Sequence, residues 1–308
     1  MNESLLNYMR CPKCISELAL KSEQRKKGEV EKGILLCKSC NSTYPIINFI
    51  PRFVGSDGYV SNFSFEWKIH KKTQLNANES EKSFYQKLGF SKERLQGKLV
   101  LDAGCGMGRY MDVALKAGAE VIGIDLSYAI DSAKENLDDN YKSHFIQADI
   151  FNLPFKAELF DVIYSIGVLH HTPNTKKAFE NLVGFLKNDG LIGIWLYSNY
   201  NKLHTESSDL LRILSTRIPT RILYGLSILS VPLYYVYKIP VVGHLLRHLF
   251  PISMRKEVDW RILDTFDWYS PKYQWKHRYP EVFSWFRDNN IQVVHLGEPP
   301  VGMTGRKR

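Results

Sequence analysis

The sequence lacks any apolar stretch long enough to cross a membrane. The uncharged run Ile222–Tyr237 spans 16 residues and contains Pro232, a residue type that interrupts helices. A membrane-spanning helix needs about 20 apolar residues, so we predict no transmembrane helix. Residues Met1–Leu6 are polar overall and lead directly to a cysteine pair, so we also expect no signal peptide. Internal repeats and low-complexity tracts are absent as well.

Cysteine is scarce, with five in 308 residues, and four of them form two C-x-x-C pairs. The pairs are Cys11 with Cys14 and Cys37 with Cys40. Such pairs favour metal ligands in a reducing compartment over disulfides, so we expect a cytoplasmic protein. Each pair places two thiolates on one turn, and two pairs complete a tetrahedral zinc site. We predict a structural zinc ion, because about fifty residues bury too little core unaided.

The charge is unbalanced, with a formal net charge of +9 and a pI near 9.1. This favours an anionic partner such as nucleic acid, an acidic lipid surface or a phosphorylated substrate. A solvated basic surface without a partner fits equally well. The length accommodates one full α/β domain and a smaller module.

From Lys98 onward, short apolar runs alternate with helical segments. This alternation is typical of βαβ units and a mainly parallel sheet with helices on both faces. The runs predicted as strands are Leu99–Leu101, Val121–Ile124, Phe160–Tyr164, Leu191–Trp195 and, as the last strand, Ile291–Val294.

The first of these strands leads into Asp102, Gly104, Gly106 and Gly108, in the pattern D-x-G-x-G-x-G. Glycine is needed because the backbone turns tightly and approaches a ligand closely. The stretch resembles motif I of class I methyltransferases that use S-adenosylmethionine (SAM). The resemblance implies that the glycine loop passes beneath the amino-acid part of SAM and that the acid helps to orient it.

Two further strands end at acids. Asp125 can accept hydrogen bonds from both ribose hydroxyls, as acids do in dinucleotide sites. The segment ending at Asp149 and Ile150 is similar to the family's third motif, which implies an adenine contact for the acid and packing against the ring for the isoleucine. The run Phe160–Thr172 closely resembles the methyltransferase type 11 subgroup. We therefore expect SAM as cofactor.

His170 and His171 follow the predicted strand Phe160–Tyr164, beside the expected methyl group. Either can act as a base or orient the acceptor; alternatively, one caps the next helix and the other packs against the sheet. Our hypothesis is that His171 matters more for turnover than for SAM binding. Tyr59, Trp67 and Gln74 precede motif I and are candidates for a lid over SAM, or for plain packing.

Leucines and isoleucines recur at helical spacing from Leu211 to Leu229, with Arg212, Arg217 and Arg221 nearby. This pattern predicts a basic amphipathic helix within residues 201–261. Two interpretations stay open. The helix either lies on a membrane surface or is a cap whose apolar stripe closes the active site.

The expected architecture is a Rossmann-like class I methyltransferase sheet of seven strands with a zinc ribbon and a helical cap. The parts are the ribbon (1–54), an aromatic linker or lid (55–97), the SAM-binding core (98–200), the cap insertion (201–274) and the end of the core (275–308).

The predicted function is methyl transfer from SAM to a small-molecule or lipid- or glycan-linked acceptor, at oxygen or carbon. The expected location is the cytoplasm, including the membrane surface. One alternative is an RNA methyltransferase, favoured by the ribbon and the charge. The chain lacks an N/D/S-P-P-Y/F box and a Pro-Cys pair, which lowers the case for nucleic acid. A second alternative is a non-catalytic SAM-binding module.

Overall fold

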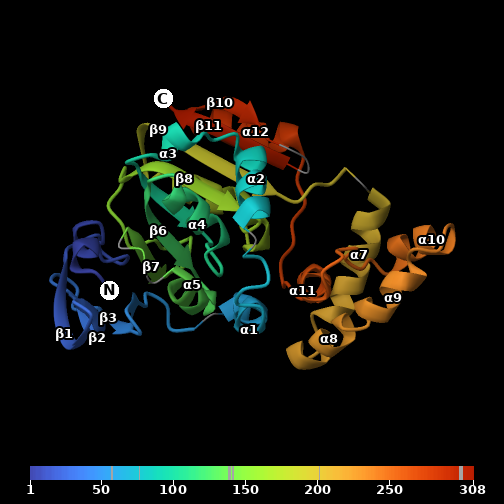
Figure 1. Cartoon of the computed structure of the whole chain (residues 1–308). Coiled ribbons are helices and arrows are strands. Elements are labelled where there is room, and N and C mark those ends of the chain that lie inside the picture. Colours follow the sequence, from blue (N-terminus) through green and yellow to red (C-terminus); the bar gives the residue numbers. More distant parts are fainter. Residues whose placement is uncertain (57, 76, 138–139, 141, 201, 298–300) are drawn as a thin grey trace.

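A computed structural model describes residues 1–56, 58–75, 77–137, 140, 142–200, 202–297 and 301–308. A central α/β core carries a small sheet at one end and a group of helices at the other (Figure 1). Among the described residues, no helix combines the length and apolar character needed to cross a membrane.

The N-terminal part is a four-stranded antiparallel sheet that follows a short helix, η1 (Glu3–Asn7). Its strands pair in chain order: β1 (Leu18–Lys26), β2 (Glu29–Cys37), β3 (Thr43–Ile47) and β4 (Ile50–Pro51). The first cysteine pair precedes β1; of the second, Cys37 ends β2 and Cys40 lies in the turn that follows. The sheet therefore brings the two pairs to the same end.

This sheet docks on the edge of the core. The Arg52 guanidinium donates to Asp131, with Nη2–Oδ1 at 2.6 Å, and to Gln147, with Nη1–Oε1 at 3.1 Å. Met9 forms a backbone bridge with Phe155, and both side chains belong to one hydrophobic cluster shared by the two parts. The ribbon and the core thus share a continuous interior.

The predicted linker forms helices. They are η2 (Gly58–Val60), α1 (Ser61–Ile69), α2 (Ala77–Leu88) and α3 (Lys92–Leu95). The end of α2 is fastened to the last strand, because the Thr304 hydroxyl donates to the Leu88 carbonyl at 2.7 Å.

The core is a seven-stranded sheet in the order β10-β11-β9-β8-β5-β6-β7. Strands β5 to β9 are parallel, and β11 runs antiparallel to both of its neighbours. The strands are β5 (Leu99–Ala103), β6 (Glu120–Asp125), β7 (Ser143–Gln147), β8 (Phe160–Ile166), β9 (Leu186–Leu196), β10 (Ile291–Leu296) and β11 (Val301–Lys307). The helices of the core are α4 (Arg109–Lys116), α5 (Ala129–Leu137), η3 (Leu169–His171), α6 (Thr175–Val183) and α12 (Tyr279–Asp288).

The sheet confirms the predicted fold class, and all five predicted runs are strands. The prediction that Ile291–Val294 is the last strand is wrong, because β11 follows it. The sequence of β11, VGMTGRK, contains two glycines and two cations and shows little of a strand's usual composition.

The helical group comprises α7 (Lys202–Ser215), α8 (Thr220–Ser227), α9 (Ser230–Val236), α10 (Val242–Leu249) and α11 (Val258–Tyr269). The predicted amphipathic helix from Leu211 to Leu229 is therefore not one helix. Pro219 stands at the N-cap of α8 in an extended conformation, and α9 begins again after Leu229. Proline cannot supply the backbone donor that a continuous helix needs at that point.

Candidate active site

The glycine loop after β5 has a backbone that other residues tolerate poorly. Gly104 has φ +86°, and a Cβ there would lie 2.3 Å from Val168 Cγ1. Gly108 has φ +90° and forms the N-cap of α4. Both positions use the left-handed region that glycine enters without strain. The loop therefore holds a fixed shape at the carboxyl end of β5.

Asp125, at the end of β6, fastens this loop. Its Oδ2 accepts a hydrogen bond from the Gly106 amide at 2.9 Å. Its Oδ1 accepts from the backbone amide and the hydroxyl of Ser127, at 2.8 and 2.6 Å. Burial raises the pKa of Asp125, and these hydrogen bonds oppose that shift because they favour the carboxylate.

One cavity lies above the carboxyl ends of β5, β6, β8 and β9. Ligands bind at this edge in open α/β sheets. The residues expected from the sequence that line it are Gly104, Gly106, Asp125, Ile150, His171 and the lid candidates Tyr59, Trp67 and Gln74.

Four other expected residues do not line this cavity: Asp102, Gly108, Asp149 and His170. Asp102 is 2% exposed, and its Oδ2 accepts from the Tyr164 hydroxyl at 3.0 Å. Burial raises the pKa of Asp102 to about 8. Its position indicates support of the loop from beneath rather than direct contact with a bound molecule.

Asp149 lies beside the cavity wall. Its Oδ1 accepts from the Phe151 amide at 3.0 Å. Burial raises the pKa of Tyr59, and the nearby carboxylates of Asp149 and Asp125 raise it further. Asp149 is therefore close enough to the lid candidate to influence it electrostatically.

The two histidines occupy different environments. His171 Nδ1 lies 2.8 Å from the Tyr273 carbonyl oxygen. A carbonyl only accepts, so Nδ1 carries the proton and Nε2 keeps its lone pair. Burial lowers the pKa of His171 to about 4, so the ring is neutral near pH 7. His170 instead stacks on Tyr197 with ring centroids 4.0 Å apart, and neither ring nitrogen has a partner among the described residues.

The cavity also contains residues that the sequence analysis missed. Arg109 donates to the Ser80 hydroxyl from Nε at 3.0 Å and to Gln74 Oε1 from Nη1 at 3.3 Å. The sequence does contain a signal for Arg109, because this residue directly follows Gly108, the last glycine of the loop. The other missed lining residues with ionisable side chains are Glu66, Lys87, Tyr110, Tyr197, Asp264 and Asp267.

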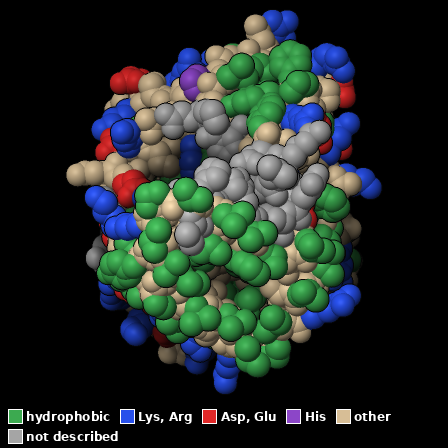
Figure 2. All heavy atoms as spheres, turned by 90° about the vertical axis from the view of Figure 1, so that its right-hand side faces the viewer, with side chains coloured by type: hydrophobic (Ala, Val, Ile, Leu, Met, Phe, Trp, Pro, Cys, Tyr) green, Lys and Arg blue, Asp and Glu red, His purple; other side chains and the backbone are tan. Residues whose placement is uncertain are grey.

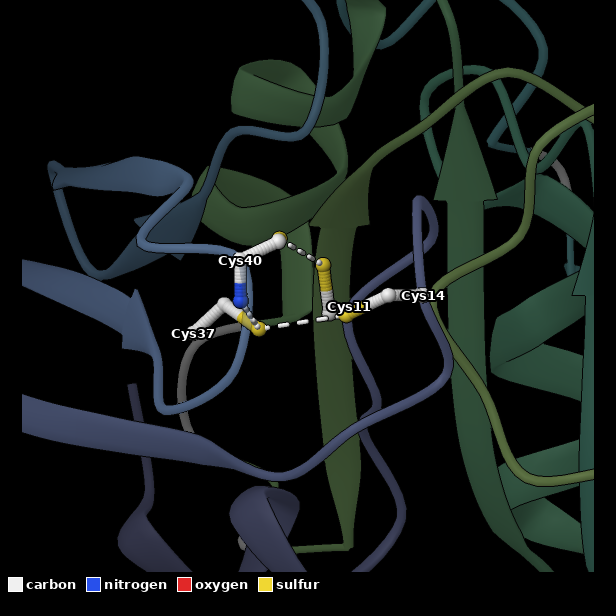
Figure 3. Close-up of side chains that lie close together, drawn as sticks. All are labelled: Cys11, Cys14, Cys37 and Cys40. Atoms are coloured by element: carbon white, nitrogen blue, oxygen red, sulfur yellow. Dashed lines mark hydrogen bonds between the residues drawn. The ribbon is translucent and has the colours of Figure 1, made fainter.

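The four paired cysteines form a second cluster (Figure 3). None of them lines the cavity. Their sulfurs all lie within 4.8 Å of one another. Cys11 Sγ lies 3.6 Å from Cys40 Sγ, and Cys14 Sγ lies 3.4 Å from Cys37 Sγ. Sulfurs around one tetrahedral zinc, with Zn–S bonds of about 2.3 Å, stand about 3.8 Å apart. The donor set and its spacing fit zinc.

The family match lies within the α/β core. Residues 101–194 match the family model described as Methyltransferase domain. The core carries a methyltransferase domain. This domain includes the glycine loop, Asp125 and both histidines, and it excludes the ribbon and the helices α7 to α11.

The curated relatives match about a third of this chain. The chain is similar to a tRNA (carboxymethyluridine(34)-5-O)-methyltransferase of Arabidopsis thaliana, with 38% identity over 32% of this chain and 24% of that protein. It is also similar to a sterol 24-C-methyltransferase of Gibberella zeae, with 33% identity over 33% of this chain and 29% of the relative. A ubiquinone biosynthesis O-methyltransferase of Coxiella burnetii is 36% identical over 31% of this chain and 42% of its own length. The chain thus spans 24% to 42% of these relatives.

Among solved structures, the chain is similar to magnesium protoporphyrin IX methyltransferase from Synechocystis PCC 6803. The identity is 15%, the match covers 81% of this chain and 97% of that one, and the TM-score is 0.47.

Proposed function

We propose that this chain is a SAM-dependent methyltransferase acting on a small-molecule or lipid- or glycan-linked acceptor, at oxygen or carbon. The observation that carries the proposal is one cavity shared by the glycine loop, the Asp125 carboxylate and the His171 ring. The methyltransferase domain supports the reaction class. The names of the relatives span RNA, sterol and quinone acceptors, so they do not single out one acceptor.

The half of the cavity over β5 and β6 fits SAM. Asp125 would accept hydrogen bonds from the ribose hydroxyls, and Ile150 would pack against the adenine. Arg109, held by Ser80 and Gln74, would bind the carboxylate of the methionine moiety. SAM supplies a methyl group on a sulfonium, so the protein mainly aligns the acceptor and excludes water.

His171 is the best-placed base for an acceptor that must lose a proton. Its Nδ1–H is held by the Tyr273 carbonyl, which leaves Nε2 for a molecule in the cavity. With its pKa lowered to about 4, the ring stays unprotonated at pH 5 and above. His170 does not line the cavity, so we assign it no step.

Replacing His171 with Ala is expected to lower kcat by about 10²- to 10⁴-fold, the usual contribution of a general base. The affinity for S-adenosylhomocysteine (SAH) is expected to stay near that of the wild type, because the cofactor half is untouched. Isothermal titration calorimetry with SAH and a turnover assay separate the two effects. Wild-type kcat in the variant would eliminate His171 as the base.

The experiment that tests the function is incubation of the purified protein with methyl-labelled SAM and a lysate of its source. We expect label in the lipid or soluble-metabolite fraction. Label confined to nuclease-sensitive material would support the RNA alternative instead. SAH binding without any labelled product would support the non-catalytic alternative.

Helices α7 to α10 present an apolar surface to solvent (Figure 2). On α8 and α9 the small residues Ser227 and Ser230 are buried, while Leu226 and Leu229 are 48% and 52% exposed. The exposed large apolar residues of this surface are Leu210, Ile213, Leu214, Ile222, Leu226, Ile228, Leu229, Tyr235, Val236, Ile239, Val241, Leu245, Leu249 and Phe250. The predicted stripe therefore points mainly outward and does not close the cavity.

We infer that this apolar surface lies on an anionic membrane. Arg217, Arg221 and Lys238 are exposed among its apolar residues, and residues 201–261 carry nine Lys or Arg against four Asp or Glu. A monolayer of anionic lipid matches both features, because apolar side chains enter the headgroup boundary and cations stay at the headgroups.

A double substitution, Leu226→Asp with Leu229→Asp, is expected to weaken binding to vesicles of phosphatidylcholine and phosphatidylserine by about tenfold or more. The matched control is Leu296→Asp on β10, a leucine that is 58% exposed outside this surface. Vesicle co-sedimentation measures the effect. Equal vesicle binding by the double variant, the control and the wild type would contradict the membrane inference.

The cysteine cluster is proposed to hold a structural zinc ion. With four thiolates as ligands the ion has no open position, so it takes no part in the chemistry. The shared hydrophobic cluster between ribbon and core supports a stabilising role.

A further inference from the structure

One part of the cavity wall, formed by α1 and α11, is acidic. Glu66 comes from α1, and Asp264 and Asp267 come from α11. Glu66 is 1% exposed, and its Oε2 has no hydrogen-bond partner among the described residues. Leaving a buried carboxylate oxygen unpaired is costly. Its position in the cavity wall indicates that a bound molecule supplies the partner.

The neighbouring groups do not neutralise this wall. Asp267 Oδ2 accepts from the Tyr197 hydroxyl at 3.2 Å, which is a neutral donor. Arg255 Nε is 3.9 Å from Asp264 Oδ2, and Arg109, which also lines the cavity, lowers the pKa of the same acid. Both cations act on Asp264, whereas neither Glu66 nor Asp267 has an ion pair among the described residues. The other charged or titratable residues of the cavity are Lys87, Cys105, Arg109, Tyr110, Asp125, Tyr59 and His171.

The pKa values agree with an excess of negative charge. Burial raises the pKa of Glu66, and the nearby Asp267 and Asp264 raise it further. Burial and Asp264 raise the pKa of Asp267 to about 7. The pKa of Asp264 rises to about 6 by burial, against the opposing effect of Arg255. A cation entering this wall would stabilise all three carboxylates.

The acidic wall lies on the acceptor side of the cavity. Tyr197, which contacts Asp267, follows β9, whereas Asp125 ends β6. Strands β8 and β5 separate these two strands in the sheet. The ribose position and the contact between Asp267 and Tyr197 are thus at different ends of the cavity, with His171, after β8, between them.

The chemistry around the acids favours an ammonium group over a metal ion. Phe63 and Tyr197 line the same cavity, and aromatic rings attract ammonium cations. The Trp195 ring already faces the ammonium of Lys87, which lies 3.9 Å from its centroid. Within the described part of the chain, the four paired cysteines are the only group whose ligand atoms gather tightly enough for a metal. The three carboxylates are therefore not arranged around one ion.

We propose that the methyl acceptor carries a protonated amine, which binds between Glu66 and Asp267 beside Tyr197. The amine is the recognition group, and the methylated atom is a different one that lies near His171. This inference rests on the proposed methyltransferase function and adds the acceptor's chemical class.

The test uses the full-length protein, methyl-labelled SAM and lysate of its source, and it separates labelled products on a cation-exchange resin at pH 5. The main labelled product should be retained as a cation. Glu66→Gln and Asp267→Asn, which keep side-chain size, should each lower kcat/KM for that product's precursor at least tenfold. Binding of SAH, measured by calorimetry, should stay within about twofold of the wild type, which also shows that the variants fold.

The control is Asp259→Asn, which removes an exposed acid from the same helix and should leave kcat/KM unchanged. In the wild type, kcat/KM should rise as the pH passes about 7 and Asp267 loses its proton; this rise should shrink in Asp267→Asn. A neutral or anionic main product, or unchanged kcat/KM in both variants, would overturn the amine proposal alone. Absence of any labelled product would overturn the methyltransferase function and the amine proposal with it.

Discussion

Replacing Cys37 with Ser is expected to lower the melting temperature by about 10 °C or more. Structural zinc sites contribute about 10 kcal/mol or more of folding free energy, and loss of one thiolate of four removes a large part of it. A loss of about 5 kcal/mol corresponds to roughly 10 °C in a chain of this size. Cys37 is fully buried at the end of β2, so the effect should reach beyond the metal itself.

The effect should spread because the ribbon is not an independent appendage. Cys37 and Cys11 belong to the hydrophobic cluster that continues through Phe155 into the sheet. Loosening the ribbon would also release the ion pair between Arg52 and Asp131. We therefore expect one cooperative transition at a lower temperature, not an added early step.

Differential scanning calorimetry and metal analysis check this expectation. The control is Cys105→Ala, which removes the fifth cysteine from the glycine loop and leaves the cluster intact. The control should keep its full zinc content. A Cys37→Ser protein with the wild-type melting temperature would show that the ribbon is stable without its complete ligand set.

Replacing Asp125 with Ala is expected to weaken SAH binding by more than about 100-fold. The carboxylate holds the Gly106 amide and Ser127, so its removal releases the loop as well as the ribose contacts. Hydrogen bonds to a charged group contribute about 1.5–3 kcal/mol each, and the loss of two exceeds the 2.7 kcal/mol that corresponds to 100-fold in affinity.

Calorimetric titration with SAH measures this loss. A suitable control is Asp112→Ala on α4, an acid whose partner is Lys116 on the surface and which does not line the cavity. If Asp125→Ala bound SAH as tightly as the control, the ribose assignment would have to move to another residue.

The parts of the site that the sequence predicted are local in the chain. The glycine pattern and Asp125 lie within 24 residues, and their meaning depends on backbone geometry that glycine alone permits. The C-x-x-C pairs are equally local, since each pair needs only one turn. For such features the sequence spacing already determines which atoms meet.

The acidic wall could not be predicted in this way. Glu66 and Asp267 are 201 positions apart and meet only because α1 and α11 pack over the same end of the sheet. The sequence also did not predict that the apolar stripe faces outward. Its spacing indicates a helix face, but not whether that face turns to the protein or to another surface. The difference between His170 and His171 depends on a carbonyl from Tyr273, about a hundred residues later.

The docking of the ribbon has a consequence for colloidal behaviour. Strand β7 is one of the two edge strands of the large sheet, and an edge strand offers unpaired amides and carbonyls to other chains. Here the Phe53 amide donates to the Gln147 carbonyl at 2.8 Å, and Arg52 forms a parallel bridge with the same residue. The ribbon thus covers part of the edge at which a second molecule could extend the sheet. A chain shortened to the core would expose it, and self-association through strand addition would follow.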